Sequence, residues 1–119
     1  MSAEHVTREA VLAVLSRHIG AEQGLSVRQL TAAAVGGPLW ATAGAERRVR
    51  HIVQELREAG HHVCAHPKHG YFMAASQAEL DETCEYLHAR AICSLRQIAA
   101  MRRVSEPDLR GQLRLPPGD

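Results

Sequence analysis

The chain has 119 residues, which is enough for one domain with an appendage and too few for two independent cores. Hydrophobic residues make up 45% of it and charged residues 23%, a balance that argues against wholesale disorder. The formal net charge is only +1 and aromatic residues make up 3%, which disfavours both a uniformly basic chain and a single-strand binder that stacks bases on several exposed rings.

The three cysteines, Cys64, Cys84 and Cys93, form no CxxC pair. No signal peptide is recognised, and no apolar run approaches the roughly 18 residues that a membrane span requires. We therefore expect a cytoplasmic protein with reduced thiols and no membrane contact.

The first third of the chain predicts two helices. Apolar residues recur at helical spacing over residues 5–19, and Gly20 follows as a stop signal. Ser26 and Gln29 match a capping box, which predicts a short second helix from residue 27 to about residue 34.

The glycines and proline at residues 36–38 cannot continue that helix, so residues 35–45 are predicted to form a long loop. Trp40 lies in this loop. Because a single tryptophan is costly to leave in water, we expect it to anchor the loop in the core, and the alternative is an exposed contact with a partner.

A third helix is predicted over residues 46–59, where apolar residues fall at positions i, i+3, i+4 and i+7 and Gly60 follows. At about 100° per residue, the opposite face is basic and polar. Residues 47–69 contain five lysines and arginines but only two acids, and they also contain five histidines. This segment therefore carries a local positive charge.

Two short extended runs around Pro67, Lys68, His69 and Gly70 predict a hairpin over residues 61–74, with the lysine at its tip. His62, Cys64 and His66 alternate along the first strand and would share a face that is solvated or turned toward DNA. Imidazole and thiolate are zinc ligands, but no second ligand pair stands at a zinc-ribbon spacing, so we expect neither a metal nor another cofactor.

Ser76 and Glu79 match a second capping box, from which a long helix is predicted to run to about residue 104. Acids fill its first turns and arginines its later turns, which suits the helix dipole. An apolar seam recurs at steps of three and four along it: Leu80, Cys84, Leu87, Ala91, Leu95 and Ile98. Core packing is expected for Cys84. The tail at 105–119 is expected to be loosely ordered.

The order helix, helix, loop, helix, hairpin predicts an α+β, mainly helical fold: a winged helix-turn-helix over residues 1–75 with a long C-terminal helix over residues 76–104. The segment ERRVRHIVQELREAG at 46–60, with GYFMA at 70–74, resembles the recognition helix and wing of bacterial winged-helix regulators, including the N-terminal domain of the biotin ligase repressor. The continuation from Ser76 through Leu87 and Arg90 is similar to small winged-helix proteins of phages and prophages. The loop at 35–45 is longer than the usual tight turn.

This pattern predicts binding of double-stranded DNA through the helix at 46–59 and the wing at 61–74, in transcription regulation or a phage-type replication role. Arginine and glutamine can make bidentate contacts to guanine and adenine edges, and wing-tip residues can contact phosphate. The predicted DNA-binding residues are Arg28, Arg47, Arg48, Arg50, His51, Gln54, Lys68 and His69. The competing interpretation of the helix residues is a solvated surface, and that of Lys68 and His69 is a turn exposed for solubility.

The seam of the long helix predicts a homodimer, because a domain of about 70 residues covers only part of a stripe of roughly 40 Å. Alternatively, this helix folds back over the first helix within a monomer. No catalytic constellation is recognised, so we expect no enzyme. The competing functions are a protein-interaction adaptor that uses the long helix, and RNA binding through the basic face.

Overall fold

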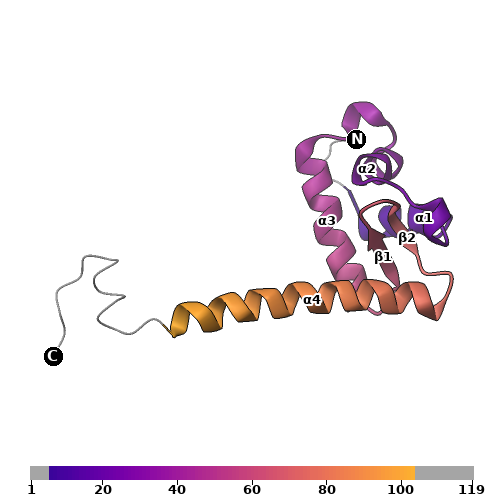
Figure 1. Ribbon diagram of the computed structural model, residues 1–119. Helices are drawn as coiled ribbons and strands as arrows, with labels where there is room; N and C mark the ends of the chain where they lie inside the picture. The colour runs from indigo at the N-terminus through magenta and orange to yellow at the C-terminus, as the bar shows by residue number, and fades with distance from the viewer. Residues whose placement is uncertain (1–5, 104–119) are drawn as a thin grey trace, which may run out of the picture. The chain divides into compact units, whose positions relative to one another are not determined.

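The computed structural model describes residues 6–103, and the predictions for residues 1–5, for Val104 and for the tail at 105–119 lie outside this range. The described chain is α+β and mainly helical, as predicted, with four α-helices and one antiparallel pair of strands (Figure 1). The elements in chain order are α1 (Arg8–Leu15), η2 (Ala21–Gln23), α2 (Val27–Val35), η3 (Pro38–Trp40), α3 (Ala43–Glu58), β1 (Val63–His66), β2 (Gly70–Met73) and α4 (Gln77–Arg102).

The described residues fall into two compact units, one ending at Cys84 and the other beginning at Glu85. The first therefore includes the first two turns of α4, beyond the boundary expected at residue 75. Among residues 6–103, no helix combines the length and the apolarity that a bilayer crossing demands.

The core of the first unit is aliphatic and is shared by α1, α2 and α3. Each helix contributes side chains that are almost fully removed from water, and Val63 extends the cluster onto β1. Burial of a Leu, Ile or Val side chain stabilises a fold by about 1.5–3 kcal/mol. The largest fully buried residues are Val11, Leu15, Leu30, Val49, Ile52 and Val53.

The helix starts follow local capping. Thr7 Oγ1 accepts from the Ala10 N–H at 3.1 Å, and Ser26 and Gln29 form the predicted capping box of α2 in both directions. Thr42 Oγ1 accepts from the Ala45 N–H at 3.1 Å, so α3 begins at Ala43, three residues earlier than predicted.

The predicted first helix is too long, because α1 ends at Leu15 rather than near residue 19. After it, the backbone pairs with β2: the Met73 N–H donates to His18 O at 2.9 Å, and the Gly20 N–H donates to Met73 O at 2.8 Å. These strand-like hydrogen bonds replace further helical turns. Ile19, one of the apolar residues within the predicted helix at 5–19, is consequently exposed.

The hairpin forms as predicted, with Val63 opposite Met73 and His66 opposite Gly70. The other edge of β2 pairs with the segment before α2. Leu25 and Tyr71 exchange both backbone hydrogen bonds, at 2.8 and 2.6 Å. The hairpin is thereby attached to the start of α2.

The first turns of α4 cover the hairpin. The Cys64 thiol donates to Glu79 O at 3.6 Å, and the Ala65 N–H donates to Thr83 Oγ1 at 3.4 Å. The predicted solvated face at Cys64 is therefore wrong, because α4 buries this side chain completely.

Glu79 was predicted to complete a capping box with Ser76, and only half of that box forms. The Glu79 N–H donates to Ser76 Oγ at 3.2 Å. The Glu79 carboxylate accepts instead from the N–H groups of Ala75, at 2.7 Å, and Ala21, at 3.0 Å. It therefore joins the start of α4 to η2, and these two hydrogen bonds lower its pKa.

Two further burial predictions are wrong. Cys84 is exposed, because Thr83 and not Cys84 turns toward the hairpin. Trp40 is 41% exposed at the end of η3, because this single-turn helix runs outside the core formed by α1, α2 and α3.

Candidate functional site

The outer side of α3 carries Arg47, His51, Gln54 and Glu58, which are all exposed as predicted from helical periodicity. The two flanks of α3 differ in their surroundings. Arg50 lies on the flank toward α2 and the hairpin, and Arg48 lies on the flank where Glu55 binds α1.

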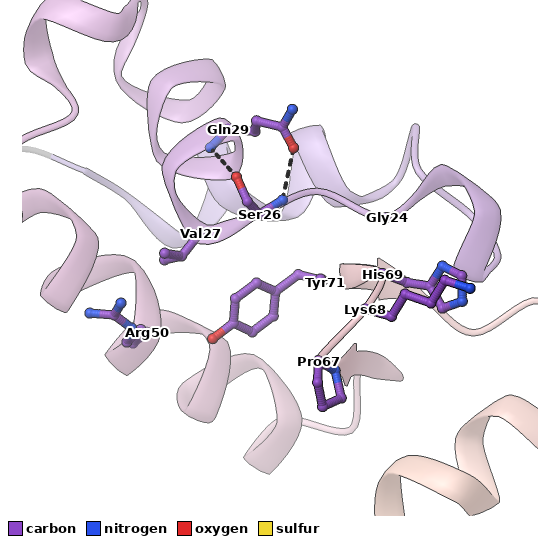
Figure 2. Close-up of a pocket in the computed structure, with 10 residues that line it drawn as sticks. Gly24, Ser26, Val27, Gln29, Arg50, Pro67, Lys68, His69 and Tyr71 are labelled. Carbon is purple, nitrogen blue, oxygen red and sulfur yellow. Dashed lines mark hydrogen bonds between the residues drawn. The ribbon is translucent and has the colours of Figure 1, made fainter.

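A groove of about 420 Å³ opens between the start of α2, the Arg50 flank of α3 and the hairpin turn (Figure 2). Arg50, Lys68 and His69 contribute cationic or titratable groups to it. The remaining lining is small, polar or aromatic: Gly24, Ser26, Val27, Gln29, Pro67, Gly70 and Tyr71. The groove therefore combines positive charge with the positive end of the α2 dipole.

Two glycines allow the hairpin turn to approach α2 this closely. A Cβ at Gly24 would lie 1.9 Å from His69 O, and a Cβ at Gly70 would lie 2.1 Å from Leu25 O. Gly70 also has a φ of +78°, a conformation that L side chains rarely adopt. The positions of Lys68 and His69 beside α2 thus depend on backbone contacts that exclude a side chain.

An acidic side chain lies between Arg50, which lines this groove, and Arg28 of α2. Glu46 lies 3.8 Å from Arg28 Nε and 3.9 Å from Arg50 Nη2, and both arginines remain largely exposed. Such surface ion pairs contribute only about 0–1 kcal/mol. Glu46 therefore positions Arg28 and Arg50 near each other without fixing them strongly.

On the Arg48 flank of α3, Glu55 is the common partner of three basic residues. Its Oε2 accepts from both Nε and Nη2 of Arg8, the former at 3.1 Å. Its Oε1 lies 3.7 Å from Arg48 Nη1 and 3.7 Å from His51 Nε2. The hydrogen bond from Arg8 lowers the Glu55 pKa despite partial desolvation, and the charges of Arg8, His51 and Arg48 act in the same direction.

Comparisons of the chain with protein-family models, curated proteins and solved structures found no match.

The structure brings together one part of the predicted DNA-binding set and separates another. The groove is lined by Arg50, Lys68 and His69. Arg28 shares the partner Glu46 with Arg50. Arg47 and Gln54 are exposed on the outer side of α3. Arg48 and His51 instead share Glu55 with Arg8.

Sequence periodicity missed the acids that organise these cations, Glu46 and Glu55, together with Arg8 and the groove residue Tyr71. The spacing of four between Glu46 and Arg50, and between His51 and Glu55, was the available signal for two of the pairs.

The histidines near the hairpin lie close to acids of α4. His66 Nε2 is 3.6 Å from Glu82 Oε1, and the rings of His66 and His69 are 5.0 Å apart. Within residues 6–103, His, Cys, Asp and Glu side chains form no group of three that could ligate a metal ion.

Proposed function

We propose that residues 6–84 form a winged helix-turn-helix that binds double-stranded DNA, with α3 in the major groove and the hairpin as the wing. The element order supports this fold, as does the pairing of β2 with the chain before α2. A helix held by an apolar stripe against a core can present its opposite side to a groove.

The observation that carries the proposal is the gathering of cations from three elements in and beside one groove. Arg50 of α3 and Lys68 of the hairpin turn line the groove, and Arg28 of α2 shares the partner Glu46 with Arg50. A positive surface assembled from separated segments suits the phosphate backbone, which supplies most of the non-specific affinity for DNA.

The exposed side chains divide by the contacts that their chemistry allows. Arg47 and Gln54 occupy the outer side of α3 and can make bidentate contacts to base edges. Lys68 and Arg28 are suited to phosphate contacts, which position the protein without reading sequence. Arg50 lies between these groups and can serve either purpose.

Glu46 and Glu55 hold arginines in the absence of DNA. A phosphate that approaches the groove would compete with Glu46 for Arg28 and Arg50, since both pairs are long and exposed. Arg48 is held by Glu55 on the other flank, so we assign it a smaller part in binding than Arg50.

The test is a duplex selected from a random pool, with affinity measured by fluorescence anisotropy. Arg47→Ala is expected to weaken binding to that duplex by about 1–3 kcal/mol, or roughly 5- to 150-fold, because a base contact is lost. Its effect on an unrelated duplex should be much smaller.

Lys68→Ala is expected to weaken binding to both duplexes alike, because it removes a phosphate contact. The slope of log K against log salt concentration should become less negative by about 0.9. Arg96→Ala, which removes an exposed arginine from α4, is the matched control. Failure of the parent chain to bind any duplex at low salt would overturn the proposal and favour the protein-interaction adaptor.

A further inference from the structure

From Leu87 onward, α4 exposes large apolar side chains. Leu87, Leu95, Ile98 and Met101 are 39%, 56%, 42% and 67% exposed. Four such residues on one helix form a surface of the kind that proteins use for contacts with other chains.

Most of these residues belong to a heptad seam. Cys84, Leu87, Ala91, Ser94, Ile98 and Met101 recur at alternating steps of three and four. This spacing places them on one side of a helix and is typical of two helices that pack together as a coiled coil. Leu95, which belongs to the seam predicted from the sequence, lies beside this heptad seam, and Ser94 occupies the heptad position in its place.

Charges along α4 are separated by sign. Residues 77–88 contain four acids and neither lysine nor arginine, whereas residues 89–103 contain four arginines and no acid. A parallel pair of these helices would place like charges together. An antiparallel pair would place each acidic half beside the arginine half of the other helix.

We propose that two copies of the chain associate through α4 as an antiparallel helix pair. In the register that matches the heptad positions, Cys84 packs opposite Met101 of the second copy, and Leu87 packs opposite Ile98 of the second copy. Ala91 and Ser94 form the central, small-residue layers, where the two backbones approach each other.

The same register places one pair of opposite charges next to each other across the dimer. Asp81 and Arg102 both flank the seam on the same side, at heptad positions that face each other in antiparallel coiled coils. Asp81 of each copy therefore lies opposite Arg102 of the other, and the two-fold symmetry provides this contact twice. This association depends on α4 and is independent of DNA binding.

Sedimentation velocity of the full chain over a range of concentrations measures the association. We expect a monomer–dimer equilibrium, and substitution of a seam residue by lysine, as Leu87→Lys or Ile98→Lys, should abolish the dimer. Both side chains are exposed, so the variants should keep the parent's far-ultraviolet circular dichroism. Leu39→Lys, at an exposed position on η3, is the matched control. A parent that stays monomeric at all concentrations would overturn the proposal.

A charge exchange tests the orientation. Asp81→Arg and Arg102→Asp should each weaken dimerisation roughly tenfold, because each creates two like-charge contacts in the dimer. The double variant should restore the parent's dissociation constant. Additive weakening in the double variant would contradict the antiparallel register.

Crosslinking provides a second test of orientation. In Cys93→Ser/Met101→Cys, mild oxidation should join Cys84 of one chain to the introduced cysteine of the other, as identified by peptide mass spectrometry. The parent should form no disulfide between two Cys84 residues. Efficient joining of Cys84 to Cys84 in the parent would indicate a parallel dimer and overturn the proposal.

Discussion

Two acids lie beside most of the basic residues of α3 and divide them between its two flanks. Glu46 holds Arg28 and Arg50 near the groove, and Glu55 holds Arg8 and Arg48 on the other flank of α3. The available positive surface is therefore smaller and more one-sided than the number of arginines indicates.

Glu55 should make stability depend on pH. Its pKa in the folded chain is lowered from 4.5 by Arg8 and the neighbouring cations, whereas the unfolded chain has no such partners. The folded state thus gains stability above the unfolded pKa and loses it as the pH falls toward the folded pKa. We expect Glu55→Gln to flatten the fall in unfolding free energy below about pH 4.5, measured by urea denaturation.

Glu58→Gln, on the exposed outer side of the same helix, is the control for Glu55. Part of the acid sensitivity should persist in Glu55→Gln, since the Glu79 pKa is also lowered. Identical pH profiles for the parent and Glu55→Gln would show that the Arg8 contact does not contribute.

Periodicity predicted which face of α3 is buried but not how its charged residues pair. The stripe of Val49, Ile52, Val53 and Leu56 is buried as expected, because hydrophobic burial is set mainly by helical geometry. The pairing of Glu55 with Arg8 joins residues 47 apart in the chain, and nothing in the local sequence encodes it.

Among the elements, the attachment of the hairpin to the start of α2 matters most for the groove. It consists of backbone hydrogen bonds between Leu25 and Tyr71 and of close contacts at Gly24 and Gly70. These contacts set the distance between Lys68 and α2.

Gly70→Ala should destabilise the fold by at least about 1–3 kcal/mol, the usual cost of a strained backbone conformation. An added Cβ also meets Leu25 O at 2.1 Å, so the strand pairing must shift. Urea denaturation measures the loss.

Gly36→Ala is the matched control for Gly70→Ala. Gly36 has a φ of +95°, but a Cβ there meets nothing within 4 Å, so only the conformational cost applies. Equal destabilisation by the two variants would contradict a role for close packing at Gly70.

The helix and strand predictions succeeded where capping and turn signals were local. The capping box at Ser26 and the turn at Pro67–Gly70 gave α2 and the hairpin nearly in full. The first helix was overextended because residues 18–20 pair with β2, a long-range contact that overrides helical periodicity. The burial of Cys64 likewise depends on α4, which follows the strand in the chain.

For the molecule as a whole, the accessibility of Cys64 tests packing within one chain, and the accessibility of Cys84 tests the association of two chains. Cys64 is buried, and desolvation raises its pKa, so its thiol stays protonated and shielded. Cys84 and Cys93 are exposed.

In dilute native protein, we expect iodoacetamide to modify Cys84 and Cys93 and to leave Cys64 unmodified until denaturant is added, as followed by mass spectrometry of the peptides. At concentrations that favour the dimer, Cys84 should become protected relative to Cys93, which lies off the seam. Rapid native labelling of Cys64 would contradict the packing of α4 on the hairpin.

The pairing of β2 with residues 18–25 also has a consequence for the smallest fragment that can fold. A polypeptide cut after Gly60 would retain the three core helices, yet the N–H groups of Gly20 and Leu25 would lose the carbonyl acceptors of Met73 and Tyr71. Leu25 O would lose its donor as well. Such a truncation should fray between α1 and α2 and become open to proteolysis there, so β2 is required for the integrity of a segment that lies far before it in the chain.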